Sequence, residues 1–381
     1  MEDTKQLVNR IGISLSGGGV RAAVFHLGIL GQLAELGLLE QITTISTVSG
    51  GSLVTGLIFT VAGNVWPTNE AFLAHCLPTI RSRLTDTHSV QRDMLTRLAW
   101  RPWQLSSRSA NQLAESISRC WGIHGLLSEL STSPRWVINA TTYETGKNWR
   151  FIPQLSMGDY AIGYVQSPQL PLAQAMAASA AVPGLIGAYE LPTKSYEWYG
   201  FGETGNRSRR RVEQAIPFDV LHLWDGSVYD FLGTEPLFKV GKEPYPPDVD
   251  YLIVCDASQP LGVHSGATAP FHQRAHRLVT IATDQVRSLR TRAILSHFRQ
   301  HPGSGAFLKI GNQSTFALPT EENANDSKVD STSSLSPQDV EWAANMETTL
   351  RSLTPHEFDL LYHHGWEVAG AILRPNFCSL G

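Results

Sequence analysis

Residues Ser16–Arg21 read Ser-Gly-Gly-Gly-Val-Arg, and about 30 residues later Thr47–Ser52 read Thr-Val-Ser-Gly-Gly-Ser. Each stretch follows a short apolar run typical of a strand and precedes apolar residues at helical spacing, so the glycines lie where a strand turns into a helix. Three successive glycines leave backbone N–H groups free of side chains, and a helix start adds positive potential. The first stretch is therefore suited to bind an anion or a developing oxyanion.

The second stretch has the pattern of a nucleophile elbow, a sharp turn that exposes a serine hydroxyl above the edge of a sheet. A β-branched strand is expected over Gln41–Val48 and an apolar helix over Leu53–Ala62, which places Ser49 on the turn between them. The usual pattern Gly-x-Ser-x-Gly is met in part, because Gly51 has the second glycine position and Thr47 replaces the first. Threonine is small enough for this position.

The spacing of the glycines disfavours a nucleotide site. A P-loop needs Gly-x-x-x-x-Gly-Lys followed by Ser or Thr, and a dinucleotide site needs Gly-x-Gly-x-x-Gly with an acidic residue further on. Neither pattern occurs in Ser16–Arg21. The pair of stretches is better interpreted as an oxyanion loop and a nucleophilic serine.

Together the two stretches resemble those of the patatin-like phospholipases, acyl hydrolases that use a serine and an aspartate without a histidine. Three more segments resemble this family: Asn139–Phe151, like its central strand and hairpin, Ala175–Gly184, like its helix of small residues that ends at a proline turn, and Leu221–Gly226, like the strand whose Asp-Gly supplies the base. The family usually continues Asp-Gly with Gly or Ala, where this chain has Ser227. The resemblance covers about the first 310 residues.

The resemblance implies roles for particular residues. Ser49 would be the nucleophile and Asp225 the base. The oxyanion loop would comprise Gly17, Gly18, Gly19 and Arg21, with the N–H groups of Gly18 and Gly19 holding the oxyanion, and the elbow would comprise Thr47, Gly50 and Gly51. The reaction would need no metal and no organic cofactor, and its substrates would be phospholipids or lysophospholipids.

The residues around Asp225 favour it as the base on independent grounds. It follows an apolar strand and precedes Gly226, so we expect it to project from a strand end towards the same crevice as the elbow. Asp219, Asp230 and Asp256 are the weaker candidates. None of the 13 histidines lies in a segment that resembles a catalytic block, and His26, within the first helix, is expected to be a core residue.

Composition sets broader limits on the protein. With 381 residues, of which 42% are hydrophobic, the chain can bury a large core, and its net charge of −4 gives no general attraction to nucleic acid. The four cysteines, Cys76, Cys120, Cys255 and Cys378, are too widely spaced to indicate a zinc site or a disulfide framework. With no secretory leader at Met1–Arg10 and no apolar run long enough to span a bilayer, we expect a cytoplasmic protein whose membrane contact is peripheral.

The expected fold class is α/β, a patatin-like three-layer α/β/α sandwich with a mainly parallel central sheet and an inserted helical subdomain. We expect a catalytic domain over residues 1–310, with the helical insertion at about 70–121. A polar linker is expected over 320–337, and the C-terminal helices over 338–381, as Asp339–Leu353 and His356–Leu373, are expected to pack on the catalytic domain.

Two stretches combine aromatic and basic residues that suit a lipid surface: Thr96–Arg108, and the region of Arg207 and Arg209–Arg211. Solvated or partly buried segments are the plainer interpretation of both. Alternatives to a simple hydrolase stay open: a hydrolase gated by a partner or small signalling molecule, an acyltransferase, and a non-catalytic lipid-binding module. The oligomeric state is not indicated by the sequence.

Overall fold

A computed structural model describes residues 10–377 except 88, 101–108, 185, 203–209, 242–244, 264–269 and 313–334. Twelve strands form one mixed sheet. They are β1 Ile11–Leu15, β2 Ile42–Val48, β3 Arg135–Thr142, β4 Asn148–Ile152, β5 Ser156–Asp159, β6 Gly163–Gln166, β7 Tyr189–Pro192, β8 Tyr199–Gly202, β9 Arg210–Glu213, β10 Val220–Asp225, β11 Tyr251–Asp256 and β12 Gly305–Lys309.

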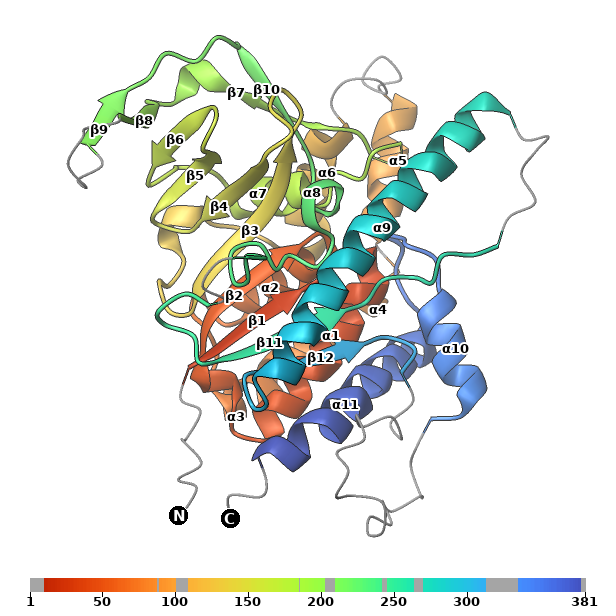
Figure 1. The fold of residues 1–381 in the computed structure, drawn as a ribbon. Coiled ribbons are helices and arrows are strands. Elements are labelled where there is room, and N and C mark those ends of the chain that lie inside the picture. The colour runs from red at the N-terminus through yellow and green to blue at the C-terminus, as the bar shows by residue number, and fades with distance from the viewer. Residues whose placement is uncertain are drawn as a thin grey trace, which may run out of the picture.

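The sheet has a parallel half and an antiparallel half. The neighbours β12, β11, β1, β2 and β3 are all parallel, with Leu15 paired to Cys255 on one side and to Thr47 on the other. From β3 the order continues through β4, β5, β6, β8 and β9 in antiparallel pairs, and β10 pairs with β3 and β7 in the same antiparallel sense. Both halves lie in one continuous twisted surface (Figure 1).

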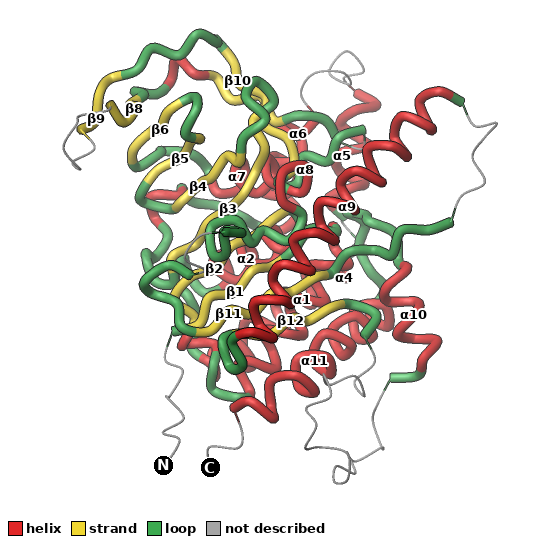
Figure 2. Tube along the Cα trace, viewed as in Figure 1, coloured by secondary structure: helices red, strands yellow, loops and turns green. Residues whose placement is uncertain are grey.

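Helices cover both faces of the parallel half (Figure 2). The helices are α1 Gly19–Glu35, α2 Gly50–Val61, α3 Asn69–Ala71, α4 Leu77–Thr85, α5 Val90–Trp100, α6 Ser109–Trp121, α7 Leu172–Ser179, α8 Ser227–Asp230, α9 Phe271–Gln300, α10 Pro337–Asn345 and α11 Pro355–Phe377, with a π-helical turn at Phe72–Cys76.

Alternate residues of β11 show that the sheet is the middle of three layers, as expected for side chains that alternate along a strand. Ile253 and Cys255 belong to the large core that includes α1 and α11, whereas Leu252 and Val254 belong to a second core with Ile294 of α9. The predicted α/β fold with helices on both faces of a largely parallel sheet is confirmed.

The region predicted as a helical insertion contains α3 to α6 and the π-helical turn. Phe72 of that turn, Ile80 of α4 and Leu113 of α6 are fully buried in the same core as α1. The division of the chain at residues 310, 320 and 338 stays a prediction, and residues 320–334 of the predicted linker lie outside the described part.

The C-terminal helices differ from the prediction in one respect. The first was expected over Asp339–Leu353, but α10 ends at Asn345, and Met346–Thr354 crosses to α11 without helical structure. The reason is tertiary contact. The carbonyls of Met346 and Thr349 accept hydrogen bonds from Arg21 and Val20 at the start of α1. In a helix, these carbonyls would accept hydrogen bonds from N–H groups of the same helix.

Candidate active site

Ser49 lies on a strained turn between β2 and α2. Its φ of 49° and ψ of −115° are conformations that a non-glycine residue rarely adopts. The two glycines that follow allow close approach: a Cβ at Gly50 would lie 2.3 Å from the Gly19 carbonyl oxygen, and one at Gly51 would lie 2.4 Å from that of Leu15. The elbow therefore packs directly on the strand and glycine loop of the first stretch.

The sheet brings Ser49 and Asp225 together through β3. Residues 138–141 of β3 pair with β4 along one edge, so β2 and β10 share the other edge. β2 reaches Asn139 with its last residue, Val48, and β10 reaches Ala140 with its last residue, Asp225. The two strands thus run towards each other and end at adjacent positions.

We expected Asp225 to project from a strand end towards the same crevice as the elbow. The two strand ends meet because β10 runs antiparallel to β3 and approaches from the direction opposite to that of β2. The direction of a short strand depends on its pairing partner, which apolar patterning does not specify.

Asp225 is fully buried, and its two carboxylate oxygens differ in their surroundings. Oδ1 accepts a hydrogen bond of 2.8 Å from the Ser227 N–H, whereas Oδ2 accepts none of ordinary geometry from the described residues. Burial raises the pKa of Asp225 to about 6, and hydrogen bonding from Ser227 and Ser49 opposes that rise. The group facing Ser49 is thus a buried carboxyl with an unoccupied oxygen, suited to accept a proton.

The glycine loop supplies backbone donors beside Ser49. A Cβ at Gly17 would lie 3.3 Å from Ser49 Cβ, so the loop and the serine are adjacent. The Gly17 N–H already donates to the Phe231 carbonyl, whereas no described residue accepts from the N–H groups of Gly18 or Gly19. Their φ values of 134° and 61° favour glycine.

Arg21 lies beneath this loop as a buried cation. Its guanidinium donates to the carbonyls of Met346 and Ala257, the latter at 3.1 Å. Burial lowers the pKa of Arg21 to about 10, while the charge of Asp256 raises it. The side chain thus ties the glycine loop to the end of β11 and to the segment after α10.

A chain of hydroxyls that the sequence did not indicate supports the elbow. Trp136 Nε1 donates to Thr47 Oγ1 at 2.9 Å, and contacts of 2.8 Å link Thr47 to Ser52 and Ser52 to Ser179. Ser179 Oγ donates to the Asn139 carbonyl at 2.7 Å. Because an indole only donates and a carbonyl only accepts, each hydroxyl proton in the chain points towards Asn139.

Ser179 connects this chain to both predicted catalytic residues. Its hydroxyl accepts from the Ser49 N–H at 3.0 Å, and two residues later the Ala181 carbonyl accepts from the Asp225 N–H at 3.0 Å. The end of α7 therefore positions both. The hydroxyl of Thr47 in this chain also explains why threonine replaces the usual glycine of the elbow.

The other candidate side chains are occupied elsewhere. Asp256 pairs with Arg287 at 2.9 Å, Asp230 lies 3.6 Å from Arg290, and Asp219 pairs with Lys194 at the surface. His26 is fully buried and donates from Nε2 to the Ser16 carbonyl at 3.1 Å, as expected of a core residue, and burial lowers its pKa to about 4.

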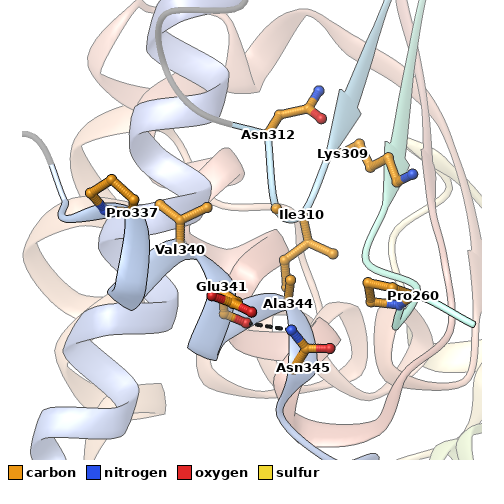
Figure 3. Close-up of a pocket in the computed structure, with 10 residues that line it drawn as sticks. Pro260, Lys309, Ile310, Asn312, Pro337, Val340, Glu341, Ala344 and Asn345 are labelled. Carbon is orange, nitrogen blue, oxygen red and sulfur yellow. Dashed lines mark hydrogen bonds between the residues drawn. The ribbon is translucent and has the colours of Figure 1, made fainter. Parts of the chain in front are cut away.

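A separate pocket of about 420 Å³ lies between the end of β12 and α10 (Figure 3). Pro260, Ile310, Val340 and Ala344 line it together with polar residues that include Lys309. Neither Ser49 nor Asp225 is part of it. Among the described residues, no three His, Cys, Asp or Glu side chains are grouped to hold a metal ion.

Comparison with known proteins shows the family to which the chain belongs. The family model for patatin-like phospholipases matches residues 13–238. A patatin-like phospholipase domain-containing protein of Neurospora crassa is 28% identical over 221 residues, which are 56% of this chain and 22% of that protein.

Solved structures of human GIVD cytosolic phospholipase A2 share the fold. One has a TM-score of 0.55 at 15% identity and covers 97% of this chain and 60% of that one. Another, in complex with methyl γ-linolenyl fluorophosphonate, has a TM-score of 0.51 at 14% identity and covers 98% of this chain and 59% of that one.

The chain belongs to the patatin-like phospholipases, a family of serine hydrolases. It spans only 22% of the length of the Neurospora relative and 60% of the human structure. In the part of the chain that the structure describes, no helix is both long and apolar enough to cross a membrane.

Proposed function

We propose that this chain is a lipid acyl hydrolase that cleaves a carboxylic ester of a phospholipid or lysophospholipid through Ser49, Asp225 and a covalent acyl-enzyme. Ser49 Oγ attacks the acyl carbonyl carbon while Asp225 Oδ2 takes its proton. The N–H groups of Gly18 and Gly19 hold the negative oxygen of the tetrahedral intermediate, and the buried charge of Arg21 lies behind them.

The intermediate collapses when the bond to the alcohol breaks, and Asp225 gives its proton to the departing oxygen. In the second half of the reaction, Asp225 takes a proton from a water molecule as the water oxygen attacks the acyl carbonyl carbon. Asp225 then gives this proton to Ser49 Oγ as the fatty acid leaves. Each half uses the same carboxyl as base and then as acid.

One observation carries the proposal: a serine held at φ 49° next to a fully buried carboxyl whose Oδ2 accepts no ordinary hydrogen bond from the described residues. Burial of a carboxyl without full compensation is costly. Such an arrangement is expected where a proton must be accepted.

The test is covalent labelling by methyl γ-linolenyl fluorophosphonate, read by mass spectrometry, together with hydrolysis of phospholipid in vesicles. We expect the wild type to gain one adduct on Ser49, and S49A to gain none and to lose activity by at least about a thousandfold. S46A is the matched control, because the Ser46 hydroxyl is also buried but bonds to Gly233 and Asn139. An adduct on S49A, or none on S46A that still folds, would contradict the assignment.

A second candidate, a gated hydrolase, is favoured by the segment Met346–Thr349. Thr349 Oγ1 lies 2.9 Å from Gln91 Oε1 of α5, and its carbonyl accepts from Val20 at the start of α1. The segment therefore lies between the helical region and the oxyanion loop. If it must move for substrate to enter, a Q91C/T349C disulfide should abolish hydrolysis until it is reduced, with both single variants as controls. Full activity of the oxidised protein would exclude this gate.

A further inference from the structure

The helix α9 carries an apolar stripe that faces solvent. Leu278, Val279, Val286 and Leu289 have relative exposures of 67%, 59%, 44% and 60%, and Ala282 is exposed between them. Positions 278, 282, 286 and 289 follow the three- and four-residue spacing of one helix face. The apolar face of a helix is normally buried against the protein. In α9, apolar side chains instead lie on the face exposed to solvent.

The other face of α9 is held firmly by the protein. Ile294 is buried in the second core, and Arg287 binds both Asp256 and Asp284. Arg290 binds Glu235 at 2.9 Å, and Glu235 lies five residues after the end of α8, the short helix that follows Asp225. The direction of the stripe is thus fixed by contacts on the opposite side.

The stripe residues before Arg287, which are all except Leu289, lie beyond the edge of the sheet that carries the elbow. Arg287 contacts Asp256, the last residue of β11, which is parallel to β1 and, through it, to β2. Residues of α9 before Arg287 therefore extend past the carboxyl ends of these strands, by about 1.5 Å per residue. Figure 1 shows this half of α9 projecting from the body.

The charges around the stripe are of one sign. The helix contains six arginines and one acidic residue, Asp284, which is paired with Arg287. Arg274 and Arg292 are exposed at either end of the stripe, and no ion pair joins them to a described residue. The solvent face of α9 is thus apolar in the middle, apart from the exposed Gln285, and cationic at its ends.

We propose that the solvent face of α9 between Arg274 and Arg292 docks this protein on the surface of a bilayer that contains anionic lipids. The apolar side chains would enter the boundary between head groups and acyl chains, and Arg274 and Arg292 would bind lipid phosphates. A second copy of the chain suits this surface less well. Five side chains are far fewer than the roughly 20–30 residues a side of a stable protein interface.

This inference goes beyond the proposed function, because it concerns docking and not bond cleavage. Docking is therefore measured with S49A protein by flotation with vesicles of phosphatidylcholine alone or with about 30% phosphatidylglycerol. We expect binding to the anionic vesicles that weakens with added salt. L278Q/L289Q, which keeps good helix formers, should weaken it by at least about tenfold. R274Q/R292Q should weaken it by about tenfold and leave binding to neutral vesicles unchanged.

V65S/L155S is the matched control, since Val65 and Leu155 are 51% and 53% exposed outside α9. It should bind vesicles as the parent does. With Ser49 restored, L278Q/L289Q should lose hydrolysis of vesicle phospholipid but keep hydrolysis of a soluble short-chain ester. The proposal is overturned if the parent does not bind anionic vesicles, if L278Q/L289Q binds as tightly as the parent, or if that variant changes only a concentration-dependent dimer.

Discussion

The most informative single residue is Asp225, because its environment opposes its ionisation. A buried carboxyl whose pKa is raised to about 6 stabilises the fold only while it is protonated, and that contribution is lost as the pH rises through 6. Near pH 8 the ionised group therefore costs stability. This cost is what the proposed chemistry would require of a base held ready beside Ser49.

Replacing Asp225 by asparagine should remove the loss of stability that the ionised carboxylate causes. We expect D225N to raise the free energy of unfolding by about 1–3 kcal/mol at pH 8, and by progressively less as the pH falls towards 4. Denaturant unfolding across this pH range measures it. A variant less stable than the wild type at pH 8 would show that Asp225 is a structural residue and not a strained base.

Ser179 is the residue whose importance could not be found from its own sequence context. It lies in a run of alanines, and only the fold places its hydroxyl against Ser52, Asn139 and the Ser49 N–H. Local patterning cannot indicate a contact between residues 130 positions apart. Glycine loops, in contrast, can be predicted from the sequence, because the backbone angles that require glycine depend on neighbouring residues only.

The hydroxyl chain predicts a specific coupling. S52A and S179A should each lower the free energy of unfolding by about 1–3 kcal/mol, because each leaves a buried polar group without a partner. The double variant should lose less than the sum, with a coupling of about 0.5–3 kcal/mol. Additive losses in a double-mutant cycle would mean that the two hydroxyls do not act as one chain.

At the scale of elements, the tightest packing is that of α1 against α11. A Cβ at Gly365 would lie 2.0 Å from the Phe25 carbonyl oxygen, and one at Gly28 would lie 2.0 Å from that of Tyr362. Glycine in the middle of a helix is normally unfavourable, so close approach is its reason here. The C-terminal helix thereby supports the helix that begins at the glycine loop.

Two alanine substitutions on the same helix test this contact. G365A should destabilise the protein by about 3 kcal/mol or more, since the helices must separate. G370A should stay within about 1 kcal/mol of the wild type, because its Cβ would meet the side-chain ends of Gln32, at 3.2 Å, and Arg374, at 3.5 Å, and no backbone atom, and because helix propensity improves. Equal thermal unfolding of the two variants would contradict the packing.

Elements were predictable where their signals were local. The strands before both glycine stretches and the helices after them follow from apolar spacing, and the elbow from its glycines. The direction of β10 and the end of α10 at Asn345 depend on partners far along the chain. The exposure of the apolar stripe of α9 could not be predicted, because apolar spacing identifies one face of a helix without indicating whether other parts of the protein bury that face.

For the whole molecule, Asp225 and Ser49 come together only because β2 and β10 end at adjacent residues of β3. The resemblance in sequence could name both residues, whereas their proximity needed the fold. The projecting half of α9 adds a surface beyond the edge at which the parallel strands end, where the elbow also lies. Chemistry and docking are thus proposed at one end of the molecule.

The central claim, that Asp225 is the base for Ser49, is tested most directly by the pH dependence of the rate at which fluorophosphonate labels Ser49. We predict a wild-type rate that falls about tenfold per pH unit below about 6, with a midpoint that hardly moves with temperature, as for a carboxyl and unlike an imidazole. D225N should label about 10²- to 10⁴-fold more slowly and lack this limb. Labelling of D225N at the wild-type rate, with the same acid limb, would contradict the account.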